Sequence, residues 1–172
     1  SVTPWEHSVY TYLYHIDAEK ARRIPIAPQH NLCYNAEKGC DNVVKELMHD
    51  PIFLARKSET ATKEDLQTAQ DLLDTLMAHR ETCVGMAANM IGVRKQIIVF
   101  DNEGTYMTMF NPEIIKTAQP YDTEEGCLSL TGVRPTTRYE NIEVTYQDQH
   151  FNTYTRKFSG WTAQIIQHEI EI

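Results

Sequence analysis

Two neighbouring residues near the end of the sequence, His168 and Glu169, carry the side chains that metal-assisted hydrolysis requires. In the helical motif H-E-x-x-H, two imidazoles at i and i+4 bind one metal ion and the glutamate is the general base. Here His168 and Glu169 are present, but Ile172 occupies the position of the second histidine. A lone histidine on a helix is more often a core residue than a ligand, so this pattern needs support from elsewhere in the chain.

A second segment with chemical potential surrounds Cys127, in the order Glu124-Glu125-Gly126-Cys127-Leu128-Ser129. The other cysteines lie at spacings that match neither a C-x-x-C redox motif nor a zinc ribbon: Cys33, Cys40 and Cys83. A cysteine that follows glycine and precedes β-type residues is suited to present a thiolate from the edge of a strand. A cysteine hydrolase that uses Cys127 with His168 and Glu169 is one interpretation of these groups. Such an enzyme would survive treatment with a chelator.

The third segment is rich in small residues and runs from Gly85 through Met86, Ala87, Ala88 and Asn89 to Met90-Ile91-Gly92. Small residues between two glycines allow a backbone or a ligand to approach closely. On its own, this segment predicts only a tight turn after a helix.

Taken together, the three segments resemble the three motifs of the peptide deformylase family. That family has a glycine- and alanine-rich motif, then E-G-C-L-S, then Q-H-E-x-D-H, in this order and at about these separations. The resemblance covers roughly residues 43–172 and implies an α+β fold, with mostly antiparallel sheets packed around a C-terminal helix that carries His168. Residues 1–42 form an N-terminal extension without assignment, expected to be an accessory arm on the domain.

The resemblance implies that Cys127 and His168 are metal ligands. Glu169 is then the general base that moves a proton from metal-bound water to the leaving amine, and the Leu128 backbone N–H helps to bind the oxyanion. Four residues are expected along the groove for the substrate: Gly85, Met86, Met90 and Arg134. Two further residues are expected to pair and to orient the loop that carries the thiolate: Glu125 and Arg138.

Two positions depart from the family pattern. Met90 occupies the place of a glutamine that helps to hold the formyl oxygen, and Ile172 replaces the second histidine. Glu171 is a candidate substitute ligand, although at i+3 it is rotated by about 100° around the helix relative to i+4. The terminal carboxylate of Ile172 is another. A helix that ends at the midpoint of a motif without a glycine or a polar cap is expected to be cut short.

We therefore expect a deformylase-like metallohydrolase that removes N-formyl groups from formylmethionyl peptides. Its activity is expected to be impaired by these two replacements. The expected partners are formylated peptide N-termini. The expected cofactor is a divalent metal, Fe²⁺ first, with Zn²⁺, Ni²⁺ and Co²⁺ also compatible with a thiolate and an imidazole. The alternative is an inactive protein with the deformylase fold that binds peptides in the same groove.

The composition excludes several other classes. The chain has 172 residues, of which 41% are hydrophobic and 23% charged, as in a globular domain of ordinary size. Its net charge of -8 argues against a nucleic-acid surface. No apolar run approaches the ~18 residues that a membrane span needs, and the N-terminus lacks the apolar centre of a signal peptide. The cytoplasm or an organelle matrix is the expected location, and the start at Ser1 suggests a processed or cloned fragment.

Periodicity predicts the elements that position these groups. Thr62 and Asp65 form a capping-box pattern before apolar residues at helical spacing, and Asn111-Pro112 is expected to end a strand. The predicted helices are residues 62–80 and 162–172, and the predicted strands are residues 95–100, 105–110, 142–146 and 153–158.

Overall fold

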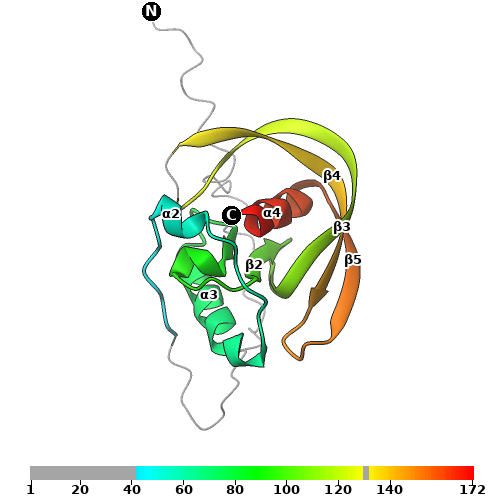
Figure 1. The fold of residues 1–172 in the computed structure, drawn as a ribbon. Helices are drawn as coiled ribbons and strands as arrows, with labels where there is room; N and C mark the ends of the chain where they lie inside the picture. Colours follow the sequence, from blue (N-terminus) through cyan, green and yellow to red (C-terminus); the bar gives the residue numbers. More distant parts are fainter. Residues whose placement is uncertain (1–41, 130–131) are drawn as a thin grey trace, which may run out of the picture.

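A computed structural model describes residues 42–129 and 132–172 (Figure 1). The predictions for the first 41 residues, which include alternating tyrosines and a charged helix-like stretch, lie outside the described residues. The helices and strands, in chain order, are α2 (Pro51–Leu54), η1 (Lys63–Asp65), α3 (Leu66–Ala78), β1 (Gly85–Ala87), η2 (Ala88–Ile91), β2 (Ile97–Asn102), β3 (Thr105–Gly126), β4 (Val133–Gln147), β5 (Thr153–Ser159) and α4 (Gly160–Glu171).

The five strands form one antiparallel sheet in the order β1-β2-β3-β4-β5. Strand β2 lies between two apolar clusters. Because strand side chains alternate between faces, Ile97 and Val99 join the cluster that contains α3, whereas Ile98 and Phe100 join the one that contains α4. The sheet thus has a helix on each side of β2 (Figure 1), and the expected α+β fold is confirmed.

The predicted helix at residues 62–80 is confirmed, with a first turn of 3₁₀ geometry. The Thr62 side chain accepts a hydrogen bond from the Glu64 N–H, and Asp65 accepts one from the Thr62 N–H, so the capping box is formed. Leu72 and Leu76 have no exposed surface and hold α3 against the sheet.

The prediction that Asn111-Pro112 ends a strand is wrong. Strand β3 continues to Gly126, and its pairing with β4 only shifts register between Phe110 and Glu113. Asn111 has φ 52°, and its side-chain amide donates to the Ala61 carbonyl at 3.0 Å. The local strain is therefore compensated within a β-bulge, a known way for a strand to bend without ending.

The continuation of β3 decides where the cysteine segment lies. In Figure 1, the long β3 and β4 ribbons curve around α4, and β4 begins at Val133, well before the predicted residues 142–146. Strand β3 ends at Gly126, so it delivers Glu125 and then Cys127 beside the final helix. That helix was predicted at residues 162–172 and begins two residues earlier, at Gly160.

Helix α4 is largely buried. Ile165 and Ile166 are 1% and 0% exposed and pack against the sheet.

Within residues 42–129 and 132–172, no helix is long and apolar enough to cross a membrane.

Candidate active site

His168 lies between two residues from the cysteine segment. Its Nδ1 is 2.9 Å from Glu125 Oε2, and its side chain also hydrogen bonds with the Cys127 thiol. Because an ionised carboxylate can only accept, Nδ1 must carry the hydrogen, and the hydrogen bond with the Cys127 thiol falls to Nε2. The structure therefore brings Cys127 and His168 together, and Glu125 fixes the tautomer of the imidazole.

Glu125 is held by a dense hydrogen-bond network. Arg138 donates to it through Nε and Nη2, at 2.8 and 2.7 Å, and Gln164 donates to Oε1 at 3.0 Å. Burial alone would raise the pKa of Glu125, but the hydrogen bonds from Arg138 and His168 outweigh it and lower this pKa to about 2. Glu125 is therefore ionised throughout the neutral range, which keeps its hydrogen bond to His168 in place.

Arg138 connects this network to the end of α4. Arg138 is 4% exposed, and its Nη1 donates to Glu171. Glu171 is thus engaged by the Arg138 guanidinium. The suggestion that Glu171 replaces the missing ligand is not supported by this position.

Glu169 is a buried carboxyl near the C-terminal end of α4. It is 5% exposed, and its Oε2 has no hydrogen-bond partner among the described residues. Burial raises the pKa of Glu169 to about 7, against a smaller lowering effect of His168. A carboxyl that is half ionised at neutral pH suits a general acid and base.

Two cavities adjoin Glu169. The smaller, of about 20 Å³, is also lined by Cys83, Met90 and Leu128. The larger, of about 350 Å³, lies at the end of α4 beside Asn89 and Ile172, and three basic residues also line it: Arg56, Lys57 and Lys95. Glu169 is the one side chain of the predicted site that faces both spaces.

The residues present supply two of the three donors that a catalytic metal site normally uses. Ile172 packs against the apolar cluster that contains Cys127, so an apolar side chain stands where the third ligand is expected. Within the described part of the chain, no group of three His, Cys, Asp or Glu residues could hold a metal ion. The donor set therefore does not fit a complete three-ligand site, although Cys127 and His168 fit as a pair.

The chain matches the family model described as polypeptide deformylase over residues 44–172. The chain belongs to the peptide deformylase family. It is 54% identical over 129 residues to a peptide deformylase of Clostridium beijerinckii, which covers 75% of this chain and 95% of that protein. A peptide deformylase of Dictyoglomus thermophilum is 35% identical over 127 residues, 71% of this chain and 80% of that protein. The crystal structure of a peptide deformylase from Legionella pneumophila is similar, with 31% identity and a TM-score of 0.68 over 75% of this chain and 80% of that one.

The structure separates the other predicted site residues of this deformylase-family chain into two groups. Gly85, Met90 and Leu128 line the small cavity with Glu169. Met86 is fully buried in the same apolar cluster as Met90 and Cys127 and lines neither cavity. Arg134 is exposed on β4 and also lines neither cavity. Arg134 is the cross-strand partner of Glu125 in the pairing of β3 with β4, so it lies beside the cysteine segment without lining either cavity.

Three residues that contribute to this site were not predicted. Gln164 holds Glu125, and Tyr121 donates to Gln164 Oε1 at 3.0 Å, which extends the network from His168 toward solvent. Asn89 donates to the Ile172 carbonyl at 3.0 Å and ties the first motif to the end of α4. Gln164 had one available signal, because at i−4 from His168 it lies on the same helical face.

We expect Gly85→Ala to damage this deformylase-family site. An added Cβ would lie 2.8 Å from both Glu169 Oε1 and Ile165 Cγ2, so the buried carboxyl or the core must move. Overpacking of this kind costs about 1–3 kcal/mol. Urea denaturation measures the loss, and Ala87→Gly serves as a matched control that removes a methyl group at the other end of β1. Unchanged stability and unchanged titration of Glu169 in Gly85→Ala would contradict this packing.

The metal-free protein is expected to lose stability as the pH rises from about 5 to 10. The pKa of Glu169 is raised to about 7, so its contribution is fully present below its ordinary pKa of 4.5 and is lost as the pH rises through 7. Burial lowers the pKa of His168, but Cys127 and Glu125 outweigh it and raise this pKa to about 10. The contribution of His168 is therefore lost between 6.5 and 10.

The variant Glu169→Gln separates the loss of stability caused by Glu169 from the loss caused by His168. The neutral amide does not titrate, so the decrease in unfolding free energy between pH 4.5 and 7, roughly 2–3 kcal/mol from the shift of Glu169, should disappear. The step above pH 6.5 should remain. Urea denaturation in the presence of a chelator gives both curves. If the variant and the parent have the same slope below pH 7, Glu169 is not the group responsible.

Proposed function

We propose that this chain is a metal-dependent hydrolase that removes N-formyl groups from formylmethionyl peptides, at a rate limited by weak metal binding. The supporting observation is the meeting of Cys127, His168 and Glu169 at one point between β3 and α4. We include residues 43–172 as the catalytic domain and residues 1–42 as an accessory arm.

The chemistry divides between the metal and the chain. A divalent metal, Fe²⁺ in our proposal with Zn²⁺, Ni²⁺ or Co²⁺ as substitutes, would be held by Cys127 and His168 and would lower the pKa of a bound water. Glu169 accepts the proton and returns it to the leaving amine, which its pKa near 7 allows. Glu125 accepts the hydrogen of His168 Nδ1, which leaves Nε2 as the ring nitrogen that would bind the metal.

The remaining residues would recognise the substrate. Gly85 on β1, the strand that ends the sheet among the described residues, and Leu128 line the small cavity beside Glu169. An extended peptide pairs readily with such an edge, and a Leu128 N–H that donates to the developing oxyanion would supply transition-state stabilisation. Met90 gives this space an apolar wall, which suits a methionine side chain. We place the protein with its formylated peptide partners in the cytoplasm or an organelle matrix.

A second candidate function is peptide binding without hydrolysis. It is favoured by the two residues that depart from the family pattern, Ile172 in place of a ligand and Met90 in place of a donor. Both changes leave the β1 edge and the apolar wall intact, so binding could persist when turnover is lost.

A formyl-methionyl-alanine peptide tests the proposal. We expect slow release of formate that ends when a chelator is added and that is absent in Glu169→Gln. Calorimetric binding of the peptide without turnover would favour the second candidate. Turnover that resists the chelator but is lost in Cys127→Ser would instead indicate a cysteine hydrolase. Absence of both binding and turnover would refute the proposal.

A further inference from the structure

The segment that leads into α2, residues 43–50, is held by hydrogen bonds to several parts of the fold. We call it the strap, and in Figure 1 it is the cyan trace beside α3. At its start, the Val43 N–H donates to Asp74 Oδ2 at 2.9 Å. The Lys45 N–H then donates to Thr75 Oγ1, also at 2.9 Å. Both acceptors belong to α3 and are buried, so the start of the strap is anchored to the core.

Near its end, the strap binds two other segments through two consecutive residues, Met48 and His49. The Met48 N–H donates to the Met90 carbonyl of η2 at 2.8 Å. His49 Nδ1 lies 3.1 Å from the Ser129 carbonyl oxygen, and because a carbonyl can only accept, Nδ1 carries the hydrogen. The strap thus joins the small-residue segment to the cysteine segment.

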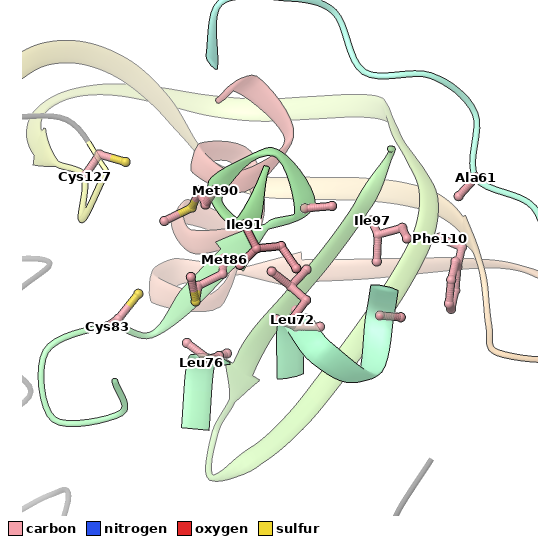
Figure 2. Packing of buried hydrophobic residues seen from close by; sticks show 13 residues of the cluster. Ala61, Leu72, Leu76, Cys83, Met86, Met90, Ile91, Ile97, Phe110 and Cys127 are labelled. Atoms are coloured by element: carbon pink, nitrogen blue, oxygen red, sulfur yellow. The ribbon is translucent and has the colours of Figure 1, made fainter. Parts of the chain in front are cut away.

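These two segments supply different parts of the lining of the small cavity beside Glu169. Met90 lines the cavity from the small-residue segment, and Leu128 lines it from the cysteine segment. Figure 2 shows the two segments as separate ribbons, with Met90 on the green η2 turn and Cys127 on the yellow segment that follows β3. The strap therefore links two parts of one cavity that are far apart in the chain.

The cysteine segment has few other backbone restraints. The pairing of β3 with β4 reaches Gly126, opposite Val133, and does not include the residues that follow. Within the described residues, the one hydrogen bond made by Leu128 or Ser129 is that between the Ser129 carbonyl and His49. A single hydrogen bond of this kind shifts the balance between two arrangements roughly three- to ten-fold.

We infer that His49 is a positioning residue, which holds the Ser129 carbonyl and thereby fixes Leu128 relative to Met90. The hydrogen bond of His49 then sets the width of the small cavity beside Glu169. The consequence for substrate rests on the proposed function, in which this cavity receives the formyl-methionyl end of a peptide. If Leu128 moves away from Met90, that peptide loses contact with one part of the cavity and binds less tightly.

The reactivity of Cys127 tests the positioning without any substrate. Cys127 is 8% exposed and lies two residues before Ser129, so its alkylation by iodoacetamide reports movement of the segment. The full chain is treated with a chelator, and the labelling of each thiol is followed by mass spectrometry. We expect His49→Ala to raise the labelling rate of Cys127 roughly three- to ten-fold and to leave that of Cys83 unchanged. His49→Gln should restore most of the parent rate, because its amide N–H can donate to the same carbonyl.

His79→Ala is the matched control for His49→Ala. His79 Nδ1 also bonds with a carbonyl, that of Thr75 at 2.9 Å, but this contact is local to the end of α3. Labelling of Cys127 in His79→Ala should therefore equal that in the parent. Equal labelling rates in His49→Ala and the parent would overturn the inference. So would the same acceleration in His49→Gln or in His79→Ala.

Calorimetry with a formyl-methionyl-alanine peptide distinguishes this inference from the proposed function. We expect His49→Ala to bind the peptide roughly three- to ten-fold more weakly than the parent does, and His49→Gln to bind it almost as well as the parent. If the parent neither binds nor hydrolyses the peptide, the proposed function fails, and the labelling of Cys127 still decides the role of His49. Equal peptide affinity in the parent and His49→Ala would overturn the link between His49 and the width of the cavity.

Discussion

Ile172→His is expected to raise the affinity for a divalent metal at least ~100-fold and to make formyl-peptide hydrolysis readily measurable. Altering a group that merely supports a metal ligand typically costs ~10–100-fold in affinity, so supplying a missing ligand should gain more. The position is suitable because Ile172 already packs on the cluster that contains Cys127, and its carbonyl is held by Asn89 at 3.0 Å. Isothermal titration with Zn²⁺ and a formate-release assay give the two values.

Metal binding should recover before the full rate does. Met90 lacks the hydrogen-bond donor that an oxyanion requires, and loss of one such donor typically costs ~10²–10³ in rate. Adding Met90→Gln to Ile172→His should therefore raise kcat further with little change in metal affinity. Ile172→Leu is the control, because it changes shape without adding a ligand. An equal gain in Ile172→Leu and Ile172→His would show that packing, and not ligation, limits the site.

Arg138→Leu is expected to destabilise the protein by about 3–5 kcal/mol. Arg138 is 4% exposed and makes two hydrogen bonds to Glu125, so its removal leaves a buried carboxylate without its counter-ion. The pKa of Glu125, held at about 2 by Arg138 and His168, should rise in the variant. Urea denaturation measures the stability, and the titration of the His168 ring by NMR reports on the network.

Lys116→Met provides the comparison for Arg138→Leu. Lys116 also pairs with a glutamate, Glu143, at 2.8 Å, but its side chain is 73% exposed. Exposed ion pairs contribute only ~0–1 kcal/mol, so this variant should keep nearly the parent stability. If both variants lose the same stability, burial of the Arg138 pair does not have the energetic importance assigned to it.

Much of this architecture could be predicted from the sequence because its signals are local. The capping box at Thr62 and the apolar spacing after it predict α3, and the run Ile97–Phe100 predicts β2. The meeting of Cys127 with His168 could not be obtained from periodicity. It was predicted from the order and spacing of three motifs that resemble one family.

The long β3 and β4 strands escaped prediction for a physical reason. Most of β3 from residue 115 to 124 is exposed, so no alternation of apolar and polar residues marks it as a strand. Asn111 and Pro112 are residues that usually end strands, and here a bulge accommodates them. The hydrogen bonds from Gln164 to Glu125 and from Asn89 to Ile172 could not be predicted from local sequence patterns either. Both join segments that are far apart in the chain.

The role of Ile172 is tested most directly by the divalent metal content of the full chain, purified without added metal and measured by elemental analysis beside Ile172→His. The structure supplies two protein ligands, Cys127 and His168, and an apolar residue at the third position. We predict well below one divalent metal per chain for the parent and close to one for Ile172→His. One tightly held divalent metal per parent chain, together with rapid chelator-sensitive turnover of a formyl-methionyl peptide, would contradict the role given to Ile172.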